Sequence, residues 1–210
     1  MSDYLSQAEN QTLEHDWQMF YHLKPEDIFV EVGAMWGSSL ASVLGAGVSR
    51  AVLVEGDLDN TRTIEARVKK LGVGNKVQVI NKAVSDKKGR GFYLRHGNPA
   101  GHMLQSEYWR WPKGYMTSEG MEVEIDTLAG ILDSLTIDRV DLLGLDCEGS
   151  EVNALKYAGK WLSEKLIKNI GAEIHGEEAK IDVMRLLKEA DYEIVSVQQA
   201  GAQVYAYARA

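Results

Sequence analysis

Short apolar runs alternate with segments of helical periodicity along most of this 210-residue chain. The apolar runs predict strands at 27–32, 51–55, 77–81, 140–145, 167–174 and 192–197. The helical patterns lie at 37–46, 58–71, 126–135, 150–158 and 177–190. Strands that alternate with helices form βαβ units, in which parallel strands make one sheet with both faces covered. The alternation therefore predicts an α/β fold around a mostly parallel sheet.

Two segments depart from this alternation. The segment 88–125 is rich in Gly, Pro and Trp and has no long helical pattern, so we expect an excursion from the sheet. We expect this excursion to contain a hairpin that pairs 90–95 with 121–125. At the C-terminus, residues 203–209 alternate with period two after a glycine turn, which predicts a final antiparallel strand.

Residues 1–24 are polar with a cluster of bulky side chains, and Pro25 follows them. This pattern predicts a short amphipathic helix or lid before the core. No internal repeat, low-complexity tract or linker divides the sequence. We therefore expect a single domain over 1–210, with the segment 1–24 as an N-terminal helix or lid and the excursion 88–125 over the active-site face.

Composition argues against several classes of protein. The formal net charge is −8, whereas a general nucleic-acid or anionic-membrane binder usually presents a basic face. Cys147 is the single cysteine, so an internal disulfide is excluded and a reducing compartment is expected. No apolar run approaches the roughly 20 residues that span a bilayer, and the N-terminus lacks the features of a signal peptide. We expect a cytoplasmic protein that binds neither nucleic acid nor membrane.

The first predicted strand carries Glu31 and passes through Gly33 and Gly37 into a helical segment. Glycine lets a backbone approach a ligand closely, and the N–H groups at a helix start point outward. The spacing lacks the full G-x-G-x-x-G pattern of a dinucleotide site, and the Glu31 carboxylate would repel a pyrophosphate. A carboxylate there suits a cationic or amine-bearing ligand better. The alternative is a tight strand-to-helix turn with no ligand.

The second predicted strand, 51–55, ends in Glu55, roughly 20 residues beyond the glycine turn. Nucleotide-binding α/β folds carry a ribose-binding carboxylate at this position. We therefore predict that Glu55 accepts hydrogen bonds from two vicinal hydroxyls. The alternative is a solvated carboxylate at a strand end.

Four motifs follow one another along the chain: Glu31-Val-Gly-Ala-Met-Trp-Gly37, Val54-Glu55, Asn81-Lys-Ala-Val-Ser-Asp86 followed by Gly89, and Leu145-Asp-Cys-Glu-Gly-Ser-Glu151. In this order they resemble the motifs of the FkbM family of S-adenosylmethionine-dependent methyltransferases. Ile125-Asp-Thr-Leu128 and Ile170-Gly-Ala-Glu-Ile-His175 extend the resemblance, which spans about residues 28 to 197. It implies a Rossmann-like class I methyltransferase fold, with a seven-stranded, mostly parallel sheet, an antiparallel last strand and helices on both faces.

The resemblance also implies S-adenosylmethionine as the cofactor and assigns residues to each part of it. The methionyl part would lie among Glu31, Gly33, Ala34 and Gly37 of the first motif, and the ribose would bind Glu55 at the end of the second strand. The adenine would lie along Ala83, Ser85 and Asp86 of the third motif. The sulfonium would lie beside Asp146 of the fourth motif.

Three positions depart from the family pattern. The family often has Asp where Glu31 stands, which is a conservative change. It often has Asn where Met35 stands, so a polar contact or a turn position with positive φ would be lost. It often has Pro where Gly56 stands, which predicts a more mobile loop. None of these changes removes the predicted cofactor site.

Methyl transfer to a hydroxyl needs an aligned acceptor and a base that takes the proton. Asp146 and Glu148 follow one predicted strand, and Glu173 and His175 end the next. Residues at i and i+2 of a strand face the same way, so each pair would project toward the site unless the strand ends between its members. These four are the predicted catalytic residues, and His102 of the excursion is a second candidate base.

The same group of residues raises the question of a metal. Carboxylates suit Mg²⁺ or Ca²⁺, and some O-methyltransferases use such an ion to orient two oxygens of the acceptor. The spacing matches no recognised metal signature, so the sequence allows a divalent metal without favouring one and leaves its ligands undefined. Glu151 begins a helical segment, where a carboxylate could simply favour the helix dipole.

From the family resemblance we expect methylation of an oxygen of a small hydroxylated or sugar-like acceptor. The aromatic side chains Tyr108, Trp109, Trp111 and Tyr115 could select that acceptor or could pack the excursion onto the sheet. Two alternatives stay open. A nucleotide-cofactor oxidoreductase on a Rossmann-type fold would need the complete glycine pattern, and a non-catalytic cofactor-binding module would bind without turnover. The sequence does not predict the oligomeric state.

Overall fold

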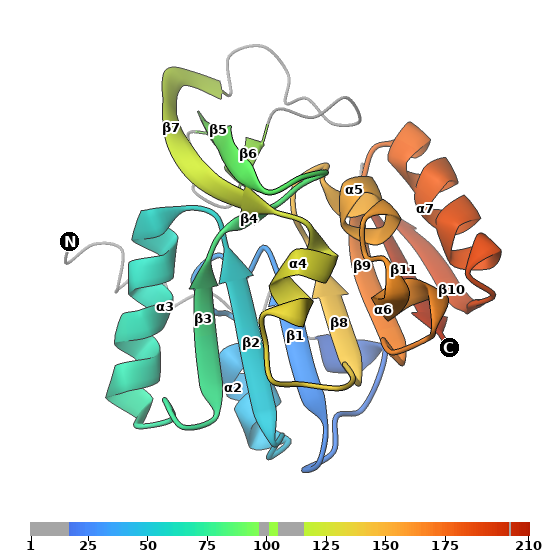
Figure 1. Ribbon diagram of the computed structural model, residues 1–210, viewed down its shortest axis with the longest axis horizontal. Helices are drawn as coiled ribbons and strands as arrows, with labels where there is room; N and C mark the ends of the chain where they lie inside the picture. The colour runs from blue at the N-terminus through green and yellow to red at the C-terminus, as the bar shows by residue number, and fades with distance from the viewer. Residues whose placement is uncertain (1–16, 97–100, 105–115, 202) are drawn as a thin grey trace.

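The computed structural model describes residues 17–96, 101–104, 116–201 and 203–210, and its centre is a seven-stranded sheet (Figure 1). In spatial order the strands are β10 (Glu193–Ala200), β11 (Gln203–Arg209), β9 (Asn169–His175), β8 (Leu142–Leu145), β1 (Ile28–Val32), β2 (Arg50–Glu55) and β3 (Val77–Asn81). β11 runs antiparallel to both of its neighbours, β9 and β10, whereas the other adjacent strands are parallel. The predicted sheet with an antiparallel last strand is confirmed.

Helices cover both faces of this sheet, because successive strand residues point to opposite sides. On one face Phe29 and Leu53 pack with side chains of α2 (Leu40–Gly45) and α3 (Leu58–Leu71). On the other face Val30 and Val52 pack with four further helices, α4 (Leu128–Asp133), α5 (Glu151–Lys156), α6 (Lys160–Ser163) and α7 (Glu177–Glu189). All four of these strand side chains are fully buried, which explains why the strands are continuous apolar runs in the sequence.

The helix boundaries follow from local turn chemistry. α3 begins where sequence periodicity predicted it, because the Asp57 side chain accepts hydrogen bonds from the backbone N–H groups of Asp59 and Asn60. It ends at Gly72, which adopts a φ of 68°. The first predicted helix, expected at 37–46, begins only at Leu40. The preceding turn holds Met35 at φ 47° and Gly37 at φ 71°, and neither value is helical.

A second, four-stranded sheet lies beyond the carboxyl ends of the parallel strands (Figure 1). Its strands, in spatial order, are β4 (Ala83–Val84), β7 (Met116–Asp126), β5 (Gly89–His96) and β6 (Met103–Leu104). β5 and β7 form an antiparallel hairpin in which Arg90 faces Glu124 and Leu94 faces Gly120. The predicted hairpin within 88–125 is therefore confirmed, and the aromatic segment 105–115 lies outside the described residues.

The described part of the N-terminal segment begins with a 3-10 turn, η1 (Trp17–Met19). Its Trp17 ring lies against Gly144 of β8, where an added Cβ would come within 2.7 Å of the ring. Gly171 of β9 is equally close to Phe20, at 2.8 Å from an added Cβ. Because these two positions have no side chain, the aromatic rings of Trp17 and Phe20 can pack directly on the backbone of the sheet. Residues 1–16 lie outside the described part, so the N-terminal helix or lid and the single-domain organisation stay predictions.

Among the described residues no helix is both long enough and apolar enough to cross a membrane.

We predict that Gly144→Ala lowers the free energy of unfolding by about 1–3 kcal/mol, because the new methyl group overlaps the Trp17 ring. The matched control is Gly45→Ala in α2, where an added Cβ meets no atom within 4 Å. Alanine favours a helix by up to about 1 kcal/mol over glycine, so the control should be neutral or stabilising. Urea unfolding followed by tryptophan fluorescence measures both. Equal stability of the two variants would contradict the packing of Trp17 on β8.

Candidate functional site

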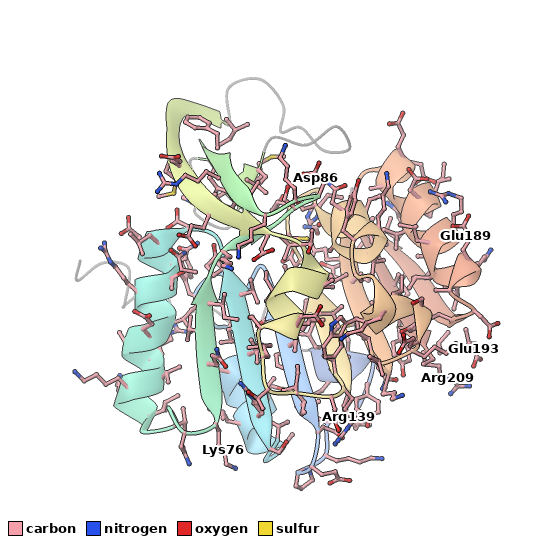
Figure 2. All side chains as sticks on the ribbon, viewed as in Figure 1. Lys76, Asp86, Arg139, Glu189, Glu193 and Arg209 are labelled. Atoms are coloured by element: carbon pink, nitrogen blue, oxygen red, sulfur yellow. The ribbon has the colours of Figure 1, made fainter. Side chains whose placement is uncertain are left out.

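The carboxyl ends of β1, β2, β8 and β9 meet at the edge of the sheet that faces the second sheet (Figure 1). In Figure 2, Asp86 lies toward this edge, whereas Lys76 and Arg139 lie toward the opposite one. Parallel α/β sheets bind their ligands at the carboxyl ends of the strands. All predicted site residues of the four strands therefore come to the expected edge.

The glycine turn after β1 packs directly against the end of β8. Gly33 adopts a φ of 84°, and an added Cβ would lie 1.6 Å from the carbonyl oxygen of Asp146. The backbone N–H groups of Gly33 and Ala34 both donate to the carbonyl of Val54, at 2.9 and 3.2 Å. Only glycine fits this position, so the turn brings the predicted cofactor residues Gly33, Ala34 and Asp146 together.

Met35 occupies the turn position where the family often has Asn. It adopts a φ of 47°, a left-handed conformation that Asn tolerates better than Met. In this conformation the backbone N–H of Met35 donates a hydrogen bond to Glu55 Oε2 at 2.7 Å. The turn with positive φ is thus present despite the substitution, and it connects the first strand end to the second.

Glu31 is buried and satisfied by the protein itself. Its Oε1 accepts a hydrogen bond from Trp17 Nε1 at 2.6 Å, and its Oε2 accepts one from Ser39 Oγ at 2.5 Å. The carboxylate therefore ties the N-terminal turn and the start of α2 to β1. The contact of Glu31 with the methionyl part of a cofactor stays a prediction, as does that of Gly37, whose φ of 71° shapes the same turn.

Glu55 ends β2 with a buried carboxylate. Its Oε1 accepts a hydrogen bond from the backbone N–H of Asp57, and its Oε2 accepts the one from Met35, both at 2.7 Å. Burial raises the pKa of Glu55 to about 8, although these backbone donors lower it. A carboxylate accepts about four hydrogen bonds, so Glu55 keeps capacity for ligand hydroxyls.

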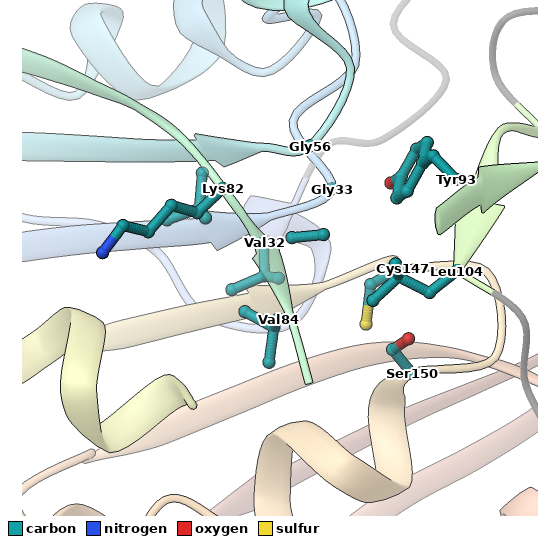
Figure 3. Close-up of a pocket in the computed structure, with 11 residues that line it drawn as sticks. Val32, Gly33, Gly56, Lys82, Val84, Tyr93, Leu104, Cys147 and Ser150 are labelled. Carbon is teal, nitrogen blue, oxygen red and sulfur yellow. The ribbon is translucent and has the colours of Figure 1, made fainter. Parts of the chain in front are cut away.

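A small cavity of about 10 Å³ lies between the glycine turn and the second sheet (Figure 3). The predicted site residues Gly33 and Ala83 line it, together with Gly56, and Tyr93 and Leu104 of the second sheet form its outer wall. The closeness of this wall explains why residue 56 is a glycine, because an added Cβ would lie 3.0 Å from the Tyr93 ring.

Ser85 and Asp86 stand outside this cavity lining. Ser85 donates its backbone N–H to Asp126 and its hydroxyl to Asp86, and Asp86 is exposed. Their contact with adenine stays a prediction.

His102 lies beside Asp57, with Nδ1 2.8 Å from Asp57 Oδ2. Burial would raise the pKa of Asp57, but the hydrogen bonds from His102, Asn60 and Asp59 outweigh it and hold that pKa below its ordinary value. The pair joins the second sheet to the start of α3. The structure thus places the His102 side chain near the carboxyl end of β2, beside Asp57, and not among the acidic residues that follow β8.

Four carboxylates surround one buried imidazole at the ends of β8 and β9. His175 Nδ1 lies 3.1 Å from Glu151 Oε1. His175 Nε2 lies 3.5 Å from Glu173 Oε1, 3.6 Å from Glu148 Oε2 and 3.8 Å from Asp146 Oδ1. We call these five residues the acidic cluster. It contains all four residues predicted as catalytic at these strand ends.

The local backbone explains how the acidic cluster forms. Glu173 and His175 occupy alternate positions of β9, as predicted. β8 ends at Leu145, before Asp146, so strand alternation does not aim Glu148. Instead a tight turn with Glu148 at φ 49° and Gly149 at φ 94° brings its side chain back to the cluster. Glu151 Oε1 holds this turn by accepting from the N–H groups of Cys147 and Gly149, at 3.2 and 3.1 Å.

Burial and mutual repulsion dominate the electrostatics of the acidic cluster. Burial and the neighbouring carboxylates raise the pKa of Glu148 to about 8, although His175 lowers it. Burial would lower the pKa of His175, but the surrounding carboxylates, Glu151 first, raise it well above its ordinary value. Burial also raises the pKa of the Cys147 thiol, as suits a small apolar side chain better than a nucleophile.

Two site residues were missed or misread in the sequence. Glu151 fits a helix-dipole role by its position, but the structure makes it the partner of His175. The signal was its place as the third carboxylate of the Asp146-x-Glu-Gly-x-Glu motif. Asp57 was not considered, although an Asp just before a helical pattern predicts an N-cap.

Comparison with protein families finds that the methyltransferase FkbM domain matches residues 27–194. The chain belongs to the FkbM methyltransferase family. This confirms the resemblance of the four motifs, since the match covers most of the sequence. A comparison with curated proteins gives no match.

Solved structures of methyltransferases share the fold. The FkbM methyltransferase from Methylobacillus flagellatus KT is 17% identical with a TM-score of 0.64, and the match covers 98% of this chain and 50% of that one. This chain therefore spans about half the length of that protein. M. capricolum TrmK, in complex with S-adenosylhomocysteine, is 9% identical with a TM-score of 0.53 over 100% of this chain and 68% of that one. Precorrin-6y C5,15-methyltransferase from Geobacter metallireducens GS-15 is 13% identical with a TM-score of 0.52, over 91% and 84%. These likenesses show the class I methyltransferase fold.

We predict that Glu55→Gln flattens the pH dependence of stability. The folded pKa of about 8 lies above the ordinary 4.5, so the unfolded chain releases this proton first as the pH rises. The Glu55 contribution therefore lowers the free energy of unfolding between pH 4.5 and pH 8, by at most about 5 kcal/mol. Urea unfolding at several pH values in this window should give a shallower decline for the variant.

The control for this measurement is Glu65→Gln on the exposed side of α3, which should keep the wild-type slope. A slope that is identical in wild type and Glu55→Gln would contradict the raised pKa of Glu55.

Proposed function

We propose that this protein is an S-adenosylmethionine-dependent methyltransferase that methylates an oxygen of a small hydroxylated or sugar-like acceptor. The observation that carries the proposal is the buried Glu55 carboxylate, which Met35 of the glycine turn orients through its backbone N–H. A fixed carboxylate beside a glycine turn suits a ligand with a ribose diol.

The residues at the strand ends fit this cofactor chemically. Gly33 and Ala34 would lie along the methionyl part, Glu55 would accept from the ribose hydroxyls, and Ala83 would contact the adenine. S-adenosylmethionine supplies an electrophilic methyl group on a cationic sulfonium. The acidic cluster begins at Asp146, which contacts Gly33, so its negative charge lies on the side where a cation would be favoured.

The cavity beside the glycine turn is smaller than a cofactor site. About 10 Å³ is room for about one water molecule, far less than the roughly 300–1,000 Å³ typical of small-molecule sites. Because Tyr93 and Leu104 form the outer wall, we expect cofactor binding to displace these two side chains. The excursion 88–125 would then lie over the bound cofactor.

The acidic cluster supplies the groups for proton removal. Transfer forms a bond between the acceptor oxygen and the methyl carbon, breaks the bond between that carbon and sulfur, and releases the hydroxyl proton. Asp146 and Glu148, which are partly exposed, are the carboxylates placed to take this proton, and Glu173 and His175 lie behind them. His102 is held by Asp57 on the other side of β1, so it is the less suited base.

Neither alternative function is favoured. A nucleotide-cofactor oxidoreductase would need the dinucleotide glycine pattern, and the family match is to a methyltransferase. A non-catalytic module would have no use for the acidic cluster. A small-molecule acceptor, and not nucleic acid, is proposed from the net charge of −8.

We predict that wild-type protein binds S-adenosylhomocysteine in isothermal titration calorimetry and that Glu55→Ala weakens this binding about tenfold or more. Two hydrogen bonds from the ribose hydroxyls contribute about 0.5–1.5 kcal/mol each, and together they correspond to that loss. Glu65→Ala, an exposed carboxylate change on α3, is the matched control and should bind as wild type does. Tight binding of a nicotinamide dinucleotide without S-adenosylhomocysteine binding would refute the proposal. Unchanged affinity in Glu55→Ala would refute the ribose assignment.

A further inference from the structure

Three side chains of the acidic cluster converge on one point. Asp146, Glu148 and His175 each present one possible ligand atom, and these atoms all lie within 4.8 Å of one another. Glu173 Oε1 is also 3.5 Å from His175 Nε2. The group offers carboxylate oxygens and an imidazole nitrogen, the ligands that hard and borderline divalent cations accept.

The separations around His175 Nε2 suit ligands of a shared ion. The carboxylate oxygens of Asp146 and Glu148 lie 3.8 and 3.6 Å from it, which is too long for a direct hydrogen bond. Two ligand atoms that are each about 2.0–2.1 Å from one Mg²⁺ ion lie about 2.8–3.0 Å apart at right angles. Binding of such an ion would therefore draw these atoms toward His175 Nε2 by roughly 0.6–1.0 Å.

Glu151 orients the imidazole as the outer partner of a metal ligand does. Its Oε1 lies 3.1 Å from His175 Nδ1, so the Nδ1 proton is directed to this carboxylate. Nε2 then faces the oxygens of Asp146, Glu148 and Glu173, where a bound cation would take the place of its proton. Metal-ligating histidines almost always donate their second ring N–H to a carboxylate or a carbonyl in this way.

A second, independent observation points to a cation. Glu151 is fully buried, and its Oε2 accepts no hydrogen bond from any described residue. The same holds for the buried Oε2 of Glu148. In the described part of the chain each of these two carboxylates has an ion pair with His175 alone. Buried carboxylate oxygens without donors are costly, and a bound cation offsets that cost.

We propose that Asp146, Glu148 and His175, with Glu173 beside them, bind one divalent cation of the Mg²⁺ or Mn²⁺ class. The ion would lie at the ends of β8 and β9, next to the Asp146 contact with the glycine turn. Its role in catalysis rests on the proposed function: the ion would hold the acceptor hydroxyl and favour loss of its proton to a carboxylate oxygen of the acidic cluster that does not bind the ion. The binding of the ion itself requires no cofactor.

Mn²⁺ tests this site, because its electron paramagnetic resonance signal reports binding without any enzymatic activity. Protein freed of metal with a chelator should abolish the signal of one equivalent of Mn²⁺ per chain, and Mg²⁺ in excess should restore it. Glu148→Gln and His175→Gln should each weaken Mn²⁺ binding tenfold or more. Glu193→Gln, an exposed carboxylate of β10, is the control and should bind as wild type does.

The outcomes separate this proposal from the proposed function. Wild-type protein that leaves the Mn²⁺ signal unchanged but binds S-adenosylhomocysteine overturns the metal site alone. Protein that binds Mn²⁺ but no S-adenosylhomocysteine supports the metal site and overturns the cofactor. Mn²⁺ affinity that is unchanged in Glu148→Gln and His175→Gln, with both variants folded by circular dichroism, also overturns the site. If His175→Gln does not fold, Glu148→Gln and the wild-type titration decide the result.

Discussion

The close contact between Gly33 and the carbonyl of Asp146 is the constraint on which the whole site depends. A side chain at Gly33 would overlap that carbonyl oxygen, so the turn after β1 and the end of β8 can meet only through glycine. On one side of this contact the turn continues to Met35, whose N–H orients Glu55. On the other side Asp146 starts the turn that brings Glu148 to His175. One backbone contact therefore joins the cofactor half of the proposed site to its acidic half.

Buried carboxylates lie close together at this edge of the sheet, in three different surroundings. Glu31 accepts hydrogen bonds from side chains of η1 and the start of α2, so it stabilises the fold. Glu55 is held by backbone N–H groups, which leaves acceptor capacity. In the acidic cluster four carboxylates surround one imidazole, and the buried Oε2 atoms of Glu148 and Glu151 accept no hydrogen bond from any described residue, which favours a cationic partner.

Much of the fold could be predicted because it follows from local patterns. Strands buried on both faces must be continuous apolar runs, so β1, β2 and β8 were predicted near their observed bounds. Period-two alternation after Gly201 was enough to predict β11. The prediction of element boundaries and side-chain packing failed where contacts between residues distant in the sequence determine them. The late start of α2 comes from the strained turn at Met35, and the placement of Trp17 comes from Gly144 and Gly171 of strands more than a hundred residues away.

The sequence by itself determined the succession of strands and helices, the family and the carboxylates that end the strands, because periodicity and short motifs are local features of the chain. Only the tertiary structure decided what each carboxylate faces. Glu31 turned toward Trp17 and Ser39, His102 toward Asp57, and Glu151 toward His175, although the sequence places no two members of any of these pairs side by side. The physical reason is that hydrogen bonds and buried charge depend on distances between strand ends, which exist only once the sheet has formed.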